Sequence, residues 1–169
     1  VKRCTKLDEI VLAIPDTEKD RVLMGLGESY GIKVFAGSEN DLVERYYQAA
    51  LWSNADIIGR LPADNATPEP TEIDRIVDHH LSLKKRGFSS NLSAIGDSGY
   101  PDGIGCEMFD FSLLEEARAR HSDPRQREHV HLNFYDYSTG QKVDAAWCPV
   151  STIKCPEGFR RPDLILDVN

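Results

Sequence analysis

Glu9-Ile10-Val11-Leu12-Ala13-Ile14 is a continuous apolar run that ends at Pro15-Asp16. A short run of this kind, without polar alternation, is typical of a strand buried on both faces, as in the interior of a parallel sheet. Apolar residues then recur at helical spacing over residues 20–30, and Gly31 suits the end of that helix. A second short strand is expected at residues 33–36. The chain therefore begins as strand, helix, strand.

The same alternation continues along the chain. Further expected elements are a helix over 42–50 with Leu42, Tyr46, Ala49 and Ala50 on one face, a strand at 56–61, a helix from about Thr71 with Ile73, Ile76, Val77 and Leu81 inward, a strand at 106–109, a helix at 113–120 opened by a capping box of Ser112 and Glu115, another polar helix opened by Asp123-Pro124, and a last buried strand at 164–168. This alternation predicts an α/β fold with a mostly parallel sheet and helices on both faces. No linker or repeat divides the chain, so we expect a single domain over residues 1–169.

Composition restricts the partners. The chain has 169 residues, a length typical of one domain, and carries 20 Lys and Arg against 28 Asp and Glu, a net charge of −8. This charge disfavours nucleic acid as a partner, and no stretch approaches the ~20 apolar residues that cross a membrane. The 4 cysteines are scattered without metal-binding spacing. We therefore expect no nucleic-acid or membrane partner, and buried or half-buried thiols in a reducing, cytoplasmic setting.

Two carboxylates follow strands of the predicted sheet. Asp64 comes after the strand at 56–61, and Asp167 ends the last strand. Because ligands gather at the carboxyl ends of parallel strands, the two side chains meet if those strands are neighbours. A pair of hard oxygen ligands suits Mg²⁺. The alternative is structural: Asp64 caps the loop or the next helix, and Asp167 only ends a strand.

Turn-forming residues dominate one later segment. Its sequence is Gly96-Asp97-Ser98-Gly99-Tyr100-Pro101-Asp102-Gly103. Proline suits the second position of a turn, and glycine adopts positive φ without steric cost. Because the segment holds little apolar surface, we expect residues 93–105 to form a projecting loop or hairpin.

Several segments match the motifs of one family in the same order. They are residues 6–13, Gly37-Ser38-Glu39-Asn40-Asp41 followed by Arg45-Tyr46, residues 60–64, Tyr100-Pro101-Asp102-Gly103, Asp123-Pro124 followed by Arg127-Glu128-His129-Val130, and residues 164–168. Together they resemble the cytidylyltransferases that make CMP-activated acidic sugars, especially the spore-coat polysaccharide type. The likeness covers nearly the whole chain, and the joint order is more specific than any one motif.

The resemblance implies a fold and an activity. The fold is a Rossmann-like nucleotidyltransferase fold, of the nucleotide-diphospho-sugar transferase type. The activity is transfer of CMP from CTP to a sugar acid or related acidic acceptor, with release of pyrophosphate, in the biosynthesis of surface polysaccharide precursors. Asp64 and Asp167 match the family's metal ligands, so they are the expected catalytic pair and the expected Mg²⁺ ligands. The resemblance also implies a homodimer.

The resemblance further indicates substrate-binding residues. His129 falls where family members contact the sugar acid, and an imidazole suits a carboxylate or hydroxyl group. Arg45 and Arg60 offer forked donors to phosphate or carboxylate. Tyr100 and Asp102 belong to the part of the chain that in the family helps to close the sugar site.

Each of these assignments has a structural alternative. His129 is otherwise satisfied by helix or loop partners, and Arg45 and Arg60 are otherwise ordinary surface or rim residues. His129 and His131 lie two positions apart, which places them on opposite faces of a helix and disfavours a two-histidine metal site unless this stretch is extended. Arg127 and Glu128 are interpreted as a structural ion pair.

The chain also departs from the family pattern. No triphosphate-binding loop with Gly, Arg and Lys precedes Val1, so we expect a chain truncated at both ends. Ala63 replaces a glycine, Asn65-Ala66 replaces Cys-Pro or Glu-Pro, and Gly105 stands where the family commonly has aspartate. These departures support a rival hypothesis, a non-catalytic remnant or dimeric assembly module that retains the nucleotidyltransferase scaffold.

Overall fold

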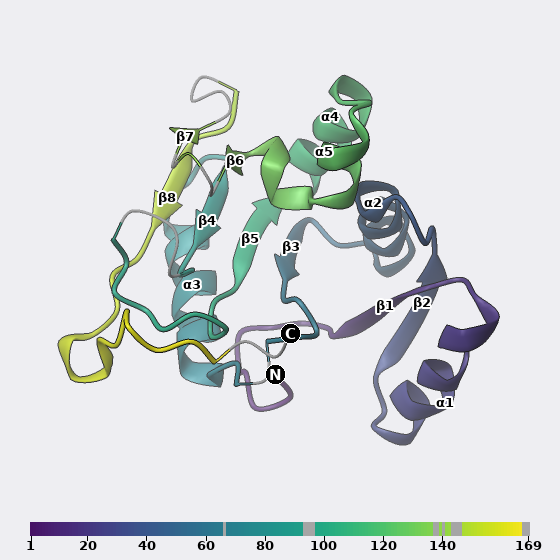
Figure 1. The fold of residues 1–169 in the computed structure, drawn as a ribbon, viewed down its shortest axis with the longest axis horizontal. Helices are drawn as coiled ribbons and strands as arrows, with labels where there is room; N and C mark the ends of the chain where they lie inside the picture. Colours follow the sequence, from purple (N-terminus) through teal and green to yellow (C-terminus); the bar gives the residue numbers. More distant parts are fainter. Residues whose placement is uncertain (66, 93–96, 137–138, 140, 143–146, 167–169) are drawn as a thin grey trace.

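A computed structural model describes residues 1–65, 67–92, 97–136, 139, 141–142 and 147–166 (Figure 1). Its elements are, in chain order, β1 (Val11–Pro15), the 3₁₀ turn η1 (Glu18–Asp20), α1 (Val22–Ser29), β2 (Lys33–Gly37), α2 (Leu42–Ser53), β3 (Ile57–Arg60), α3 (Pro70–Ser82), β4 (Phe88–Ser90), β5 (Glu107–Asp110), α4 (Phe111–Arg120), α5 (Pro124–Glu128), the 3₁₀ turn η2 (Val130–Asn133), β6 (Tyr135–Asp136), β7 (Gln141–Lys142), β8 (Val150–Thr152) and the 3₁₀ turn η3 (Glu157–Phe159).

The first unit is a parallel strand–helix–strand. β1 and β2 pair in parallel, from Val11 opposite Lys33 to Pro15 opposite Gly37. α1 connects the two strands and packs against β2, while α2 contacts both strands (Figure 1). The expected order of strand, helix and strand is confirmed. The expected burial of the first strand on both faces is wrong: Ile14 is buried and the other residues of β1 are half-buried, because among the described strands β1 pairs only with β2.

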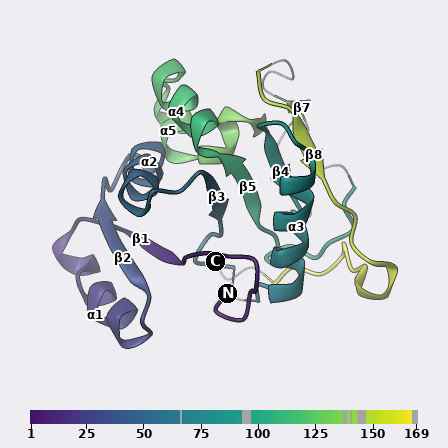
Figure 2. The same cartoon turned by 180° about the vertical axis from the view of Figure 1, so that it is seen from behind.

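A second, mixed sheet of 4 strands has the order β3-β5-β4-β8. β5 runs antiparallel to both of its neighbours, and β4 pairs in parallel with β8. Along β5, Met108 packs with the apolar residues of α3 and Phe109 with those of α4, so helices cover both faces (Figures 1 and 2). The α/β class and the two helical layers are confirmed. The sheet is less parallel than expected because β5 returns between β3 and β4.

Aromatic side chains fill the core between this sheet and α4. Phe88, Phe109 and Phe134 are fully buried. The ring centroids of Phe109 and Phe134 lie 5.3 Å apart, and those of Phe134 and Trp147 lie 5.8 Å apart. Aromatic pairs at this spacing stabilise a core beyond the burial of their apolar area.

The expected projecting loop is wrong for the part that the structure describes, residues 97–105; residues 93–96 lie outside it. Ser98 and Tyr100 are each only 1% exposed. Polar partners make this burial possible, since Ser98 Oγ donates to the Leu92 carbonyl at 2.7 Å and accepts from the Tyr100 amide at 3.3 Å. The segment is therefore part of the packed body.

The closing segment also differs from the expected buried strand. Ile165 is 71% exposed and forms an isolated parallel bridge with Asp102, while residues 167 and 168 lie outside the described residues. The segment does not join the mixed sheet at any described residue. The edge strands of that sheet are β3, which pairs with β5, and β8, which pairs with β4.

Two details of the helices differ as well. Leu81 at the end of α3 is 57% exposed, and His80 is buried in its place. α4 begins at Phe111 after Asp110, two residues before the beginning expected from a capping box of Ser112 and Glu115. The Asp110 carboxylate accepts instead from the Gly87 amide at 2.7 Å, a partner that local sequence does not reveal.

None of the helices that the structure describes has the length and apolar character needed to cross a membrane.

We predict that Phe134→Ala lowers the free energy of unfolding by about 3–5 kcal/mol, because it leaves a cavity among buried rings. Urea denaturation followed by tryptophan fluorescence measures the change. Phe159, which is 73% exposed, provides the matched control, and Phe159→Ala should change stability by no more than about 0.5 kcal/mol. Equal effects of the two substitutions would contradict the assigned core.

Candidate active site

Asp64 lies in a turn directly beyond the carboxyl end of β3. The Asn65 amide closes this turn by donating to the Pro62 carbonyl at 3.2 Å. The Asp64 side chain is exposed and has no hydrogen-bond or ion-pair partner within the described part of the chain. A carboxylate in this situation is available to a ligand from solvent.

The loop that contains Asp102 and Gly105 contacts both this turn and the closing segment of the chain. The Asn65 side-chain amide donates to the Gly105 carbonyl at 3.2 Å. Asp102, close by in the same loop, donates its amide to the Leu164 carbonyl and accepts from the Leu166 amide, both at 2.9 Å. Asp167 follows Leu166 directly but lies outside the described residues, so its separation from Asp64 stays a prediction.

Tyr100 and Asp102 have different surroundings although they share one turn. Tyr100 is buried and donates its hydroxyl to Glu72, while Arg75 donates to the same hydroxyl at 2.9 Å. Burial and the bond to Glu72 raise the pKa of Tyr100 well above its ordinary value. Asp102 is exposed, and its carboxylate accepts from the Gly103 amide at 3.1 Å. Tyr100 therefore attaches this loop to α3, and Asp102 faces solvent.

Arg60 forms a buried ion pair with Glu107. Its Nη1 lies 2.9 Å from Glu107 Oε2, and the two side chains are 13% and 1% exposed. The pair joins directly opposed positions of β3 and β5. The alternative of an ordinary surface or rim arginine is thus wrong, because Arg60 is held by a carboxylate inside the protein. Sequence reasoning missed Glu107, although a charged residue inside the short apolar run Cys106–Phe109 was a usable signal.

His129 and His131 lie beside each other, because the stretch is not one continuous α-helix. α5 ends at Glu128, His129 has an extended backbone, and His131 lies in the 3₁₀ turn η2; the two ring centroids are 5.9 Å apart. Burial, opposed in part by Glu107, lowers the pKa of His131 to about 4. His131 is therefore neutral at pH 7. The His129 side chain is exposed to solvent.

Arg45 lies across the carboxyl end of β2. Its Nη1 donates to the Ser38 carbonyl at 2.9 Å, and its buried Nε has no hydrogen-bond partner in the residues that the structure describes. A Cβ at Gly37 would lie 3.1 Å from Arg45 Cγ, so the glycine lets this side chain pass close to the strand. Arg45 is half-buried.

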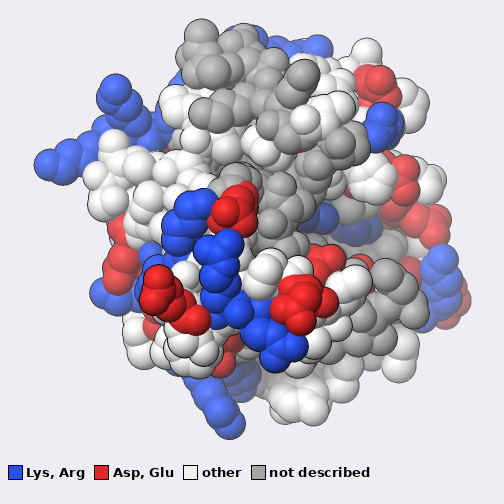
Figure 3. Space-filling model, turned by 60° about the vertical axis from the view of Figure 1, so that its left-hand side comes forward, with Lys and Arg blue, Asp and Glu red and all other residues white. Residues whose placement is uncertain are grey.

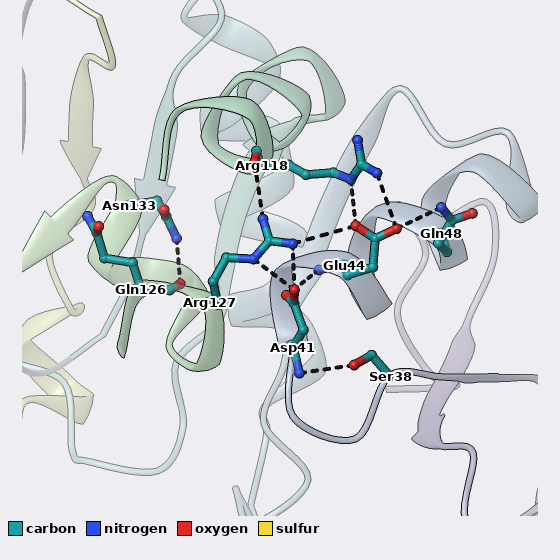
Figure 4. A network of polar contacts seen from close by, with 8 residues as sticks. All are labelled: Ser38, Asp41, Glu44, Gln48, Arg118, Gln126, Arg127 and Asn133. Carbon is teal, nitrogen blue, oxygen red and sulfur yellow. Dashed lines mark hydrogen bonds and ion pairs between the residues drawn. The ribbon is translucent and has the colours of Figure 1, made fainter. Parts of the chain in front are cut away.

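An ion-pair network joins the beginning of α2 to α4 and α5 (Figure 4). The Asp41 carboxylate caps α2 by accepting from the Glu44 amide at 2.9 Å. It also accepts from Arg127 Nε at 2.8 Å and Nη2 at 2.5 Å. Arg127 Nη1 donates to the Arg118 carbonyl at 3.1 Å, and Arg118 Nε pairs with Glu44 at 2.5 Å. The expected pair of Arg127 with Glu128 is therefore wrong, because Arg127 bonds across to another helix.

Charges of both signs lie side by side on the described part of the face drawn in Figure 3. Among the described residues no group of 3 or more His, Cys, Asp or Glu side chains is placed to hold a metal ion. The cysteines are free, three of them buried and Cys4 half-buried, as expected. Burial raises the pKa of the Cys106 thiol to about 12, which leaves it protonated and unreactive at neutral pH.

Known proteins resemble this chain in sequence and in fold. No protein-family model matches it. An uncharacterized protein of Methanocaldococcus jannaschii is 31% identical over 136 residues, 80% of this chain. The spore coat polysaccharide biosynthesis protein SpsF of Bacillus subtilis is 26% identical over 163 residues, 96% of this chain. The chain spans 53% and 62% of the lengths of these two proteins.

Two solved structures share the fold. A cytidylyltransferase from Leptospira borgpetersenii serovar Hardjo-bovis superposes on 99% of this chain and 66% of its own, with a TM-score of 0.83 and 26% identity. A CMP:2-keto-3-deoxy-manno-octonic acid synthetase complexed with CTP superposes on 91% of this chain and 75% of its own, with a TM-score of 0.63 and 11% identity. At that identity the second likeness concerns the fold alone.

We predict that Glu44→Gln destabilises the protein at pH 7 by about 1 kcal/mol, through the weakened bonds to Arg118. Hydrogen bonding from Arg118 lowers the pKa of Glu44 from 4.5. The unfolded chain therefore takes up this proton first as the pH falls, so the stabilisation is complete above pH 4.5 and is lost below it. Urea unfolding of both proteins between pH 7 and pH 3 should show the difference shrinking.

Glu28, exposed and without a described ion pair, supplies the control for this experiment. Glu28→Gln should leave stability unchanged at pH 7. A Glu44→Gln effect that persists at pH 3 would show that packing, and not the charge, carries the contribution.

Proposed function

Since this chain is related to the cytidylyltransferase family in both sequence and fold, we propose that its protein transfers CMP from CTP to a sugar acid or related acidic acceptor. Pyrophosphate is the second product. The reaction serves the biosynthesis of surface polysaccharide precursors in the cytoplasm. The likeness to a spore coat polysaccharide biosynthesis protein supports a role in polysaccharide biosynthesis, and the likeness to a cytidylyltransferase structure supports cytidylyl transfer.

The observation that carries this proposal is the free carboxylate of Asp64 beyond the carboxyl end of β3. Its oxygens are exposed and unpartnered in the described structure, which fits a hard divalent cation such as Mg²⁺. Asp64 and Asp167 are the proposed ligands. When bound there, Mg²⁺ would neutralise phosphate charge as the acceptor oxygen attacks the α-phosphorus.

The acceptor binds, in this proposal, beside Arg60 and His129. Glu107 fixes the guanidinium of Arg60, so the arginine is held in place before a substrate arrives. The ring of neutral His131 lies beside that of His129. Exposed His129 can then donate to a carboxylate or hydroxyl of the sugar acid. Arg45 and Asp102 remain proposed substrate contacts, and Tyr100 a proposed residue of the same site.

The homodimer implied by the family remains a proposal as well. Light scattering at micromolar concentration measures the mass of the particle. A mass of one protomer would contradict the dimer without affecting the proposed reaction.

We predict that Asp64→Asn in the full-length protein abolishes metal-dependent pyrophosphate release from CTP, because the amide has lost the charge that binds the cation. A loss of about 10²-fold or more is expected for a direct metal ligand. Asp167→Asn should have the same effect. Asp78→Asn on the exposed face of α3 is the control and should keep full activity. Full activity in both test variants would reject the proposed catalytic pair.

We predict that His129→Ala raises the KM for the acceptor about tenfold while changing the KM for CTP little, because one hydrogen bond to the acceptor is lost. Initial rates with each substrate varied separately distinguish the two constants. His121 lies near the Asp41 network and is not one of the residues proposed to bind the acceptor, so His121→Ala should change neither constant. A selective increase in the KM for CTP would place His129 at the nucleotide instead.

A further inference from the structure

Within the described residues, no hydrogen bond or ion pair holds the Asp64 side chain in place. Its carboxylate is exposed and unpartnered within the described residues, and it lies between Pro62 and Asn65 in a turn closed by one backbone hydrogen bond of 3.2 Å. A metal ligand must be held close to its productive geometry to bind with useful affinity. The position of Asp64 therefore depends on what holds its neighbours.

Asn65 supplies a bond from this turn to the body of the protein. Its Nδ2 donates to the Gly105 carbonyl at 3.2 Å, across 40 residues of sequence. Gly105 packs closely against Leu92, since a Cβ there would lie 2.3 Å from Leu92 Cδ2 and 2.9 Å from Leu92 Cα. The adjacent Cys106 amide donates to Asn91 Oδ1 at 2.7 Å. The acceptor of the Asn65 bond is therefore a fixed point of the structure.

We propose that Asn65 is the positioning residue for Asp64: its amide holds the metal-binding turn against the backbone of Gly105. This inference rests on the proposed function, since it assigns a task to Asp64. It also links two positions at which the sequence departs from the family pattern. Gly105 lets the backbone approach Leu92 closely, and Asn65 uses the carbonyl that this approach presents.

Two substitutions separate positioning from charge. Asn65→Ala removes the donor, so the affinity for the cation should fall about tenfold, as is typical when a group that orients a metal ligand is removed. Asn65→Asp has nearly the same shape but places an acceptor opposite the Gly105 carbonyl. If charge alone mattered, the added carboxylate would tighten cation binding; if position matters, binding weakens.

The test uses the full-length protein and Mn²⁺ as the probe, with bound and free ion measured by electron paramagnetic resonance in the presence and absence of CTP. Both Asn65 variants should bind Mn²⁺ about tenfold more weakly than the unaltered protein, with unchanged melting temperature. In pyrophosphate assays, Asn65→Ala should need about tenfold more Mg²⁺ for half-maximal rate and should regain the full rate at saturating Mg²⁺. A merely structural role would not give a defect that the cation repairs.

Thr67→Ala is the matched control, because Thr67 is exposed in the same loop and has no described hydrogen bond; it should bind Mn²⁺ normally. Normal Mn²⁺ affinity in Asn65→Ala, or tighter binding in Asn65→Asp, would overturn the inference while leaving the proposed reaction intact. If Asp64→Asn also binds Mn²⁺ normally, the proposed metal role of Asp64 fails and the inference fails with it.

Discussion

The ion pair between Asp41 and Arg127 joins the beginning of α2 to α5 and so connects the two parts of the fold that α2 contacts. α2 is the element that contacts the β1-β2 pair on one side and α4 and α5 on the other. Asp41 begins α2 with one carboxylate oxygen and binds Arg127 with the other, so one side chain both starts the helix and attaches it to α5 (Figure 4). The pair is only partly exposed, at 18% and 29%, which limits screening by solvent. Because α5 leads directly into His129, this contact also helps to fix where His129 lies.

Local elements of the fold are predictable from sequence, and their long-range arrangement is not. The continuous apolar run at β1, the helical spacing of α2 and the Asp-Pro beginning of α5 all depend on neighbouring residues, and the structure confirms them. The direction of β5 depends on strands that are distant in sequence. The burial of Tyr100 depends on Glu72, which is 28 residues away, so turn-like composition predicted a projecting loop where the structure has a packed one.

The candidate site shows the same division. The place of Asp64 directly after the strand β3 is predictable from sequence, and the carboxyl ends of strands are where α/β proteins bind ligands. The contacts around Asp64 are not predictable from sequence, since Arg60 bonds to Glu107 across 47 residues and Asn65 bonds to Gly105 across 40. Family motifs give residue types and their spacing, but they do not give the bonding partner of each side chain. Arg127 illustrates this, because its sequence neighbour Glu128 suggested a partner that the fold replaces with Asp41.

The β1-β2 pair and the mixed sheet differ in how far apart their strands lie along the chain, and this affects the order in which they can form. β1 and β2 pair with partners only 22 positions apart, such as Val11 with Lys33, whereas β4 and β8 pair Phe88 with Val150, 62 positions apart. Closing a longer loop costs more conformational entropy before any contact compensates it. The β1-α1-β2 unit is thus suited to early assembly during synthesis. The mixed sheet, by contrast, cannot be completed until β8 has been made, so its β4 edge stays open to other chains for longer.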